Sequence, residues 1–198
     1  MDTTDFCILA LFGLFVAFLI YFAIRRDRDW RQFAEERNGT FESGKLGSRP
    51  TVCIEHLGRK VQFSQPKTYG SQRGATEIQL EWPGPGSFEM ELVPKLARFL
   101  LKRPGPEISM RGHALARSHV LYGSEPNQVQ RHLTPVVLDS IVDLDALWPG
   151  CDGLKLSLTG GQLTFLKPGD CWSKTRLEEL AESVTGTYTK LLEAAGMD

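Results

Sequence analysis

The chain has 198 residues, of which 41% are hydrophobic and 24% charged, and its formal net charge at pH 7 is −1. Two of the 24 acidic residues, Asp2 and Asp5, precede a long apolar run, so 22 acidic residues face 23 basic ones in the rest of the chain. This balance gives no long-range field that would attract nucleic acid or steer an anionic substrate, so we expect no nucleic-acid partner. The length suits one domain or two small ones.

Residues 6–24 form an uncharged apolar run that contains no proline and one glycine. As a helix rising about 1.5 Å per residue, this run is about 28 Å long, which matches the roughly 30 Å hydrocarbon core of a bilayer. A helix that is apolar on every side is either a membrane span or the centre of a large soluble core. A chain of 198 residues is too small to enclose it, so the run predicts a transmembrane helix.

The residues on either side of the run predict its orientation in the inner or plasma membrane. Four arginines, Arg25, Arg26, Arg28 and Arg31, follow the run directly, and basic residues are retained on the cytoplasmic side. We therefore expect the N-terminus outside and residues 25–198 in the cytoplasm. Arg25, Arg26, Arg28 and Trp30 are the candidate membrane-interface residues. A cleaved signal peptide is the weaker alternative, because the preceding residues are acidic and Ile24 to Arg26 is no cleavage site.

The four cysteines, at positions 7, 53, 151 and 171, are widely spaced and form no CxxC pair. One of them lies in the predicted span, which leaves three for the rest of the chain. Free thiols in a reducing compartment fit this odd number better than a disulfide framework does.

The region after the span predicts a helix over residues 25–38 and then strands. Hydrophobic residues alternate with polar ones over 52–55, 61–63, 77–82 and 88–92, which is typical of an antiparallel sheet with one buried face. His56 to Arg59 reads as a hairpin turn, and residues 94–101 read as a short helix. Residues 102–106 (KRPGP) form the clearest internal break.

The second half predicts a strand near 115–122, a helix over 124–133 capped by Ser124, and a helix opened by Thr134 and Pro135. A hairpin over 154–165 turns at Gly160 and Gly161. Ser173 caps a last helix with one apolar face from Leu177 to Leu192. The fold class is therefore α+β: an N-terminal transmembrane helix, then an antiparallel sheet packed against a C-terminal helix. Three segments are expected: an anchor (1–29), a first lobe (30–103) and a second lobe (104–198).

No stretch carries a convincing catalytic, cofactor or metal signature, so we expect a non-enzymatic protein without a cofactor. Gly39 to Lys45 matches the GxxxxGK frame of a phosphate-binding loop, but Leu46 stands where that motif needs Ser or Thr. The histidines form no metal-binding pair. Asp139, Asp143 and Asp145 flank core-spaced apolar residues, which favours a solvated helix face over acid–base chemistry.

Trp82 and Trp148 are the candidate partner contacts, because each precedes a Pro-Gly pair at the end of a predicted element. Tryptophan at such a rim can anchor a binding partner. The alternative interpretation is that the two rings close the ends of the core.

The order of elements resembles a class of uncharacterised bacterial proteins that have one N-terminal span and a cytoplasmic α+β domain. The residues that carry the resemblance are Trp30, Phe33 and Ala34; Gly58 to Val61; Thr76 to Ile78; and Gly161 to Leu163 with the helix up to Leu180. The resemblance covers most of the chain. It implies a membrane-anchored domain, but no activity and no site residue.

These features predict a non-catalytic, single-pass accessory subunit that docks on other integral membrane proteins from the cytoplasmic face. Such a subunit would stabilise a larger complex, for example a respiratory or photosynthetic one. Its expected partners are the lipid bilayer and other membrane proteins. The alternative is a membrane-anchored sensor domain that binds a lipid or a small ligand in a cleft between its lobes.

Overall fold

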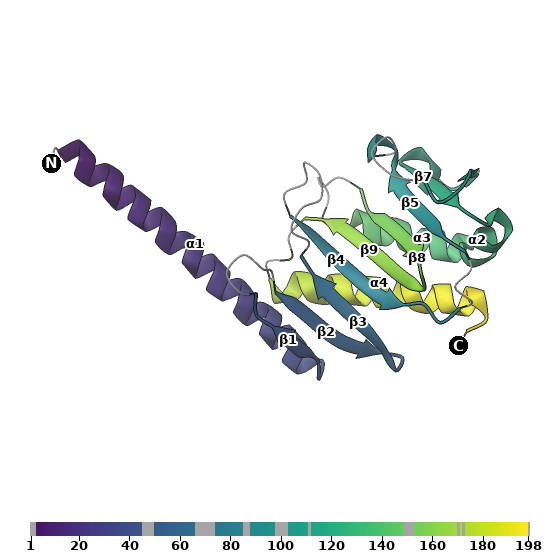
Figure 1. Ribbon diagram of the computed structural model, residues 1–198, viewed down its shortest axis with the longest axis horizontal. Coiled ribbons are helices and arrows are strands. Elements are labelled where there is room, and N and C mark those ends of the chain that lie inside the picture. The colour runs from purple at the N-terminus through teal and green to yellow at the C-terminus, as the bar shows by residue number, and fades with distance from the viewer. Residues whose placement is uncertain are drawn as a thin grey trace.

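The computed structural model describes residues 3–44, 50–65, 74–84, 88–97, 103–110, 112–148, 153–169, 171 and 173–197, with side chains from residue 8 onward. Within these residues the chain forms one nine-stranded sheet, four α-helices and two short 3₁₀ turns. The N-terminal half of the first helix projects away from the domain, and the other helices lie against the sheet (Figure 1). The predicted α+β class is confirmed, with an N-terminal apolar helix, an antiparallel sheet and a C-terminal helix.

The strands are all paired antiparallel, in the spatial order β1-β2-β3-β4-β9-β8-β5-β7-β6. Their bounds are β1 Thr40–Glu42, β2 Thr51–His56, β3 Arg59–Ser64, β4 Ala75–Glu81, β5 Met90–Pro94, β6 Glu107–Ile108, β7 His119–Gly123, β8 Lys155–Thr159 and β9 Gln162–Pro168. The helices are α1 Thr3–Glu36, α2 Pro126–His132, α3 Pro135–Ala146 and α4 Lys174–Ala195, and the 3₁₀ turns are η1 Lys95–Ala97 and η2 Ala114–Arg117.

The two faces of the sheet differ because side chains alternate along each strand. One row across the sheet, set by the strand register, is entirely apolar and buried: Val52, Phe63, Ile78, Phe165, Leu156, Leu92, Leu121 and Ile108. The C-terminal part of α1, together with α3 and α4, covers this face (Figure 1). The next row is polar apart from one tyrosine: Cys53, Gln62, Gln79, Thr164, Ser157, Glu91, Tyr122 and Glu107. We call this second face the open face.

Both predicted hairpin turns are confirmed, and each has two residues with positive φ. Leu57 and Gly58 have φ values of 53° and 70°, and Gly160 and Gly161 have values of 59° and 77°. Two-residue turns of this kind match the right-handed twist of paired strands, which is why they favour glycine. These turns fix the β2–β3 and β8–β9 registers.

The predicted caps hold for two of three helices. The hydroxyls of Thr134 and Ser173 accept hydrogen bonds from the first turns of α3 and α4. Ser124 does not cap α2, which begins after Glu125; its hydroxyl instead accepts a hydrogen bond from the backbone N–H of Glu89. The expected strand at 115–122 begins only at His119, because η2 precedes it. The helix expected at 94–101 begins as η1, and residues 98–102 lie outside the described part.

Strands from both sides of residue 103 interleave in the sheet. The predicted boundary between lobes falls between β5 and β6, yet β4 pairs with β9 and β5 pairs with β8. One hydrophobic cluster extends from Trp30 in α1 to Leu192 in α4. Residues of both predicted lobes therefore share one core.

Gly186 offers a direct test of the energetics of α4. It has no positive φ, and a Cβ atom there would meet nothing within 4 Å. Replacing Gly186 with alanine should therefore raise the free energy of unfolding by about 0.5–1 kcal/mol, measured by denaturant titration of the full chain in detergent.

Gly160→Ala is the matched control, because a Cβ atom there also has open space but the backbone has a φ of 59°. That variant should lose about 1–2 kcal/mol, because an L-residue is strained in the left-handed region. A loss of stability in Gly186→Ala would contradict the helical geometry at this position.

Candidate functional site

Helix α1 is both the candidate membrane span and a core helix of the domain. It runs without a break from Thr3 to Glu36, and one stretch of it is long and apolar enough to cross a bilayer. The apolar side chains from Ile8 to Ile24 are exposed, whereas Trp30, Phe33 and Ala34 are at most 1% exposed. No loop separates the span from the domain, so the orientation of one determines the orientation of the other.

Trp30 joins α1 to the segment before α4. Its indole Nε1 donates a 2.8 Å hydrogen bond to the backbone carbonyl of Cys171, and its ring is 0% exposed. Phe33 packs edge-on against Phe63 of β3, with 5.6 Å between ring centroids. Trp30 therefore packs inside the domain, and the contact of its ring with lipid headgroups that the sequence predicted does not fit this burial. The i, i+3, i+4 spacing of Trp30, Phe33 and Ala34 marks a helix face packed on protein.

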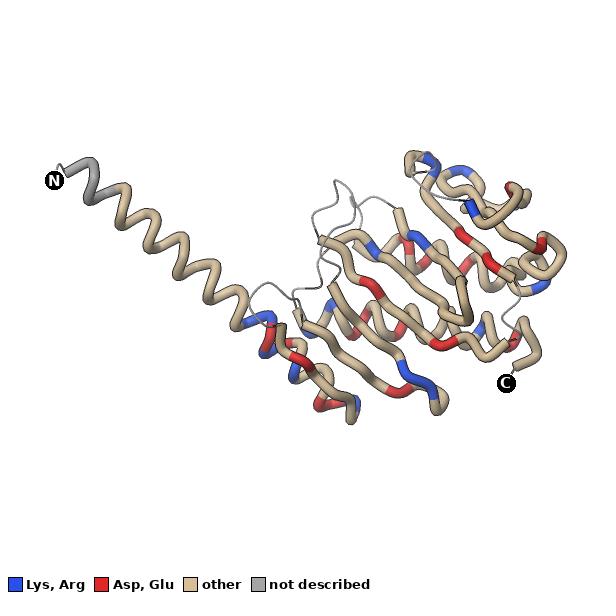
Figure 2. The backbone as a smooth tube through the Cα atoms, viewed as in Figure 1, with Lys and Arg blue, Asp and Glu red and all other residues tan. Residues whose placement is uncertain are grey.

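The flanking arginines differ in their surroundings. Arg25 is exposed, and Arg28 has a side chain that is 73% exposed and lies 3.7 Å from Asp29. Arg26 is only 17% exposed, and its guanidinium lies 3.1 Å from Asp27. Figure 2 shows basic and acidic residues on α1 directly after its apolar stretch. Contact of Arg25, Arg26 and Arg28 with lipid stays a prediction.

A surface ion pair ties the end of α1 to the start of α4. Lys174 Nζ lies 2.5 Å from Glu36 Oε2, and it also lies 3.4 Å from Glu178. The hydrogen bond from Lys174 lowers the pKa of Glu36 and raises the pKa of Lys174. Both groups are on the surface, so this pair orients the two helices more than it stabilises them.

The two candidate partner contacts, Trp82 and Trp148, lie in different environments. Trp82 is only 4% exposed and packs against His132, so it closes an end of the core, and its predicted role as a partner contact is wrong. Trp148 is half-buried; its Nε1 donates a 3.2 Å hydrogen bond to Glu179, and Arg176 lies 5.3 Å above its ring. A partner contact through Trp148 stays a prediction.

A hollow of about 500 Å³ lies on the open face, next to the predicted lobe boundary. Its lining residues are Glu89, Glu91, Arg103, Pro104, Lys155, Ser157 and Thr159. Glu91 is 8% exposed and lies 2.6 Å from Lys155, while Arg103 lies 5.2 Å above the ring of Tyr122. This lining offers cations, carboxylates and hydroxyls together, so it can hold a polar group that both donates and accepts hydrogen bonds.

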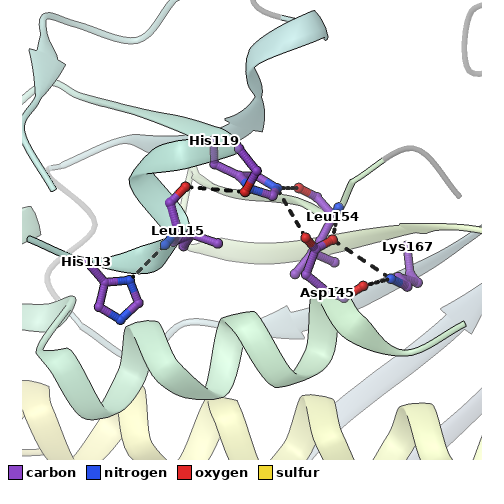
Figure 3. Close-up of polar contacts among 7 residues, drawn as sticks. His113, Leu115, His119, Asp145, Leu154 and Lys167 are labelled. Carbon is purple, nitrogen blue, oxygen red and sulfur yellow. Dashed lines mark hydrogen bonds and ion pairs between the residues drawn. The ribbon is translucent and has the colours of Figure 1, made fainter. Parts of the chain in front are cut away.

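A buried polar cluster joins β7, α3 and β9 (Figure 3). His119 Nε2 lies 3.0 Å from the carbonyl of Leu154 and 4.0 Å from a carboxylate oxygen of Asp145. That carboxylate accepts a 2.6 Å hydrogen bond from the backbone N–H of Leu154. Lys167, which is 1% exposed, donates to the backbone carbonyl of Asp145 and lies 3.9 Å from its carboxylate. The cluster fixes the C-terminal end of α3 to the sheet.

His119 in this cluster has the geometry of a structural group. Ser118 Oγ lies 2.8 Å from Nδ1 of His119. The other ring nitrogen, Nε2, lies closer to the backbone carbonyl of Leu154 (3.0 Å) than to the carboxylate of Asp145 (4.0 Å). In a Ser-His-Asp triad a carboxylate hydrogen-bonds the second ring nitrogen, and the 4.0 Å from Nε2 to Asp145 is too long for that hydrogen bond. Burial lowers the pKa of His119, although Asp145 opposes the shift.

The remaining sequence candidates are dispersed in the structure. His113 caps η2 and pairs with Asp139 at 3.0 Å, and Asp143 is exposed. In the described part of the chain, no three His, Cys, Asp or Glu residues converge in a way that could hold a metal ion. Lys45 of the GxxxxGK frame and Cys151 lie outside the described residues. The described free thiols are Cys53, on the open face, and the buried Cys171.

Two functional features were missed by reasoning from the sequence. Lys167 lies just beyond the hairpin predicted over 154–165, but it continues the buried face of β9 after Leu163 and Phe165. Alternate residues of a strand share one face, so continuing from Leu163 and Phe165 by two more residues would have placed Lys167 on the buried face. The ion pair of Glu91 with Lys155 had no sequence signal, because β5 and β8 are 60 residues apart and only the sheet order makes them neighbours.

The indole hydrogen bond of Trp30 can be tested by Trp30→Phe. This change leaves the buried Cys171 carbonyl without its donor, which should lower the free energy of unfolding by about 2–3 kcal/mol. Trp148→Phe is the control, because it removes only a partly exposed hydrogen bond and should cost less than about 1 kcal/mol. Equal losses in denaturant titrations would contradict the assigned role of Trp30.

Burial lowers the pKa of His56, His119 and His132 in the folded chain. The unfolded chain therefore binds more protons as the pH falls below about 6.5, and folding stability should fall with it. Urea titrations at pH 7.5 and 5.5 measure this loss. His119→Asn should show a smaller loss than the wild type, and an unchanged loss would contradict the burial of a neutral imidazole.

No protein-family model matches the chain, and no curated protein matches it. Among solved structures, it is similar to the crystal structure of the mycobacterial trehalose monomycolate transport factor A, TtfA, with a TM-score of 0.55. The sequences are 15% identical, and the match covers 85% of this chain and 95% of that one. At this identity the likeness shows a shared fold.

Proposed function

We propose that this chain is a membrane-anchored, non-catalytic accessory protein that docks on another integral membrane protein involved in lipid transport. The observation that carries the proposal is the continuity of α1, which is an exposed apolar rod at one end and a core helix at the other. A domain fixed to its anchor in this way is confined to one distance and one orientation beside the membrane. Such confinement raises the effective concentration of the domain toward a neighbouring membrane protein.

The lipid-transport part of the proposal is supported by the fold shared with a protein described as a transport factor. This likeness favours lipid transport over the respiratory or photosynthetic complex expected from the sequence. The cytoplasmic location of the domain rests on the arginines after the span and is part of the proposal. A ligand-binding sensor is the second candidate, and the hollow beside Glu91 and Lys155 favours it.

Native membranes extracted with a gentle detergent provide the first test. The tagged chain should migrate on native gels in a complex much larger than its own 22.2 kDa, together with a co-purifying membrane protein. Migration as a single chain with bound detergent would overturn the docking role. A thermal-shift screen against soluble metabolites addresses the sensor alternative, since a ligand at 100 times its Kd adds about 2.7 kcal/mol.

The rigid coupling is tested by inserting Gly-Ser-Gly-Ser between Ile24 and Arg25. The insertion keeps both the span and the domain but breaks the helix between them, so recovery of the partner should fall at least several-fold. The same four residues inserted before Thr3 are the control and should leave recovery unchanged. Equal recovery from both variants would show that the rigid connection is not needed for docking.

A further inference from the structure

One large apolar side chain of the domain is almost fully exposed. Leu96, in the 3₁₀ turn η1, is 90% exposed, which is more than any other large hydrophobic side chain in the described part of the chain, the apolar half of α1 included. A single exposed leucine is ordinary on a protein surface. Its neighbours and its position relative to α1 therefore decide what Leu96 contacts.

The side chains next to Leu96 are basic. Lys95 precedes it in η1 and is exposed. The backbone N–H of Lys95 donates a 2.8 Å hydrogen bond to the carbonyl of Ser118. This bond places η1 beside the end of η2, where Arg117 is also exposed. We call Lys95, Leu96 and Arg117 the basic corner.

The two cations of the basic corner are available to an anionic partner. Among the described residues, no carboxylate pairs with Lys95 or Arg117. Asp139, which lies close to η2, is paired with His113 at 3.0 Å. The sequence from 94 to 106 contains no acidic residue. The charge at this corner therefore complements an anionic surface.

The strand register fixes the position of the basic corner along α1. Trp30 Nε1 donates to the Cys171 carbonyl, and the Cys171 N–H donates a 3.4 Å hydrogen bond to Thr76 of β4. Thr76 lies two residues before the buried row of the sheet. Pro94 of β5 and Lys167 of β9 lie two residues from the buried row on the same side. We call this second row the outer row, and it lies at the level of Trp30.

Strand β5 runs toward the membrane span. Along α1, Trp30 at the outer row comes before Phe33, which packs on Phe63 in the buried row. Strand β5 passes the two rows in the opposite order, because Leu92 precedes Pro94, and η1 follows its end. Figure 1 shows that the projecting half of α1 leaves the domain on the side where β4 begins. The basic corner therefore lies on the side of the sheet that faces the bilayer.

The helical rise sets the distance of the basic corner from the hydrocarbon core. Trp30 is six residues beyond Ile24, so the outer row lies about 9 Å past the end of the apolar run. Leu96 is two residues beyond Pro94, and a 3₁₀ turn rises about 2 Å per residue, which places Leu96 about 5 Å past the run. The headgroup layer is about 5–8 Å thick. Leu96 therefore lies at the level of the headgroups when α1 is upright, and deeper when α1 tilts toward β5.

We propose that the basic corner rests on the bilayer that α1 spans, with Leu96 among the headgroups and Lys95 and Arg117 beside anionic phosphates. Basic side chains are attracted to an anionic leaflet, and an apolar side chain beside them leaves water at the headgroup boundary. Strand β5 lies near the opposite edge of the sheet from α1, so this second attachment fixes the tilt of the domain. The inference requires that α1 spans the bilayer, but it does not depend on the proposed docking function.

Fluorescence quenching in vesicles that contain no other protein tests this contact. The full chain, with Leu96 replaced by the fluorescent amino acid dansylalanine, is reconstituted into dioleoyl phosphatidylcholine mixed with dioleoyl phosphatidylglycerol. A phosphatidylcholine with a nitroxide on its headgroup should quench this residue at least several-fold more strongly than it quenches dansylalanine at Leu57. Leu57 is the matched control, because it is a 59% exposed leucine in the β2–β3 turn, at the end of the sheet away from the span.

The role of the cations is tested with the label kept at position 96. Lys95→Gln combined with Arg117→Gln should at least halve the quenching, and so should vesicles of phosphatidylcholine alone, because both remove the attraction to anionic lipid. Arg59→Gln combined with Lys60→Gln removes two cations from the β2–β3 turn and should leave the quenching unchanged.

Equal quenching at positions 96 and 57 would overturn the proposal and leave Leu96 to a protein partner. Quenching at position 96 that is insensitive both to the loss of the two cations and to the lipid charge would also overturn it, because anionic lipid would then have no part in the contact.

Discussion

The arrangement depends on the burial of one face of α1 in the domain directly after its apolar half. Trp30 is held by the Cys171 carbonyl and Phe33 by Phe63, so the helix cannot rotate without opening the core. The backbone hydrogen bonds of α1 continue through the junction, and no flexible linker absorbs motion there. Any tilt of the span in a bilayer is therefore transmitted to the sheet as a rigid-body movement.

The sheet has a protected face and an open face because helices cover only one of them. Polar side chains on the open face pair with one another. Glu91 and Lys155, for example, form an ion pair between β5 and β8, two neighbouring strands that are distant in sequence. At the far end of the core, Asp145 accepts hydrogen bonds from the Leu154 backbone N–H through its carboxylate and from Lys167 through its backbone carbonyl, and these hold the end of α3 in place. A lysine that is 1% exposed needs such a partner, since an unpaired buried charge is costly.

Two hollows on the surface of the domain differ in character. The hollow between α1 and β1 is lined by the exposed side chains of Arg31 and Glu35, whereas the open-face hollow contains the ion pair of Glu91 with Lys155.

The sequence by itself determined the apolar span, the two hairpins, the caps of α3 and α4, and the apolar face of α4. Each of these follows from neighbouring residues through helical or strand periodicity and turn chemistry. Only the tertiary structure decided the order of the strands, the burial of Trp30 and Trp82, and the pairing of Glu91 with Lys155. Those features depend on contacts between residues far apart in the chain, and local patterns do not encode which distant strands become neighbours.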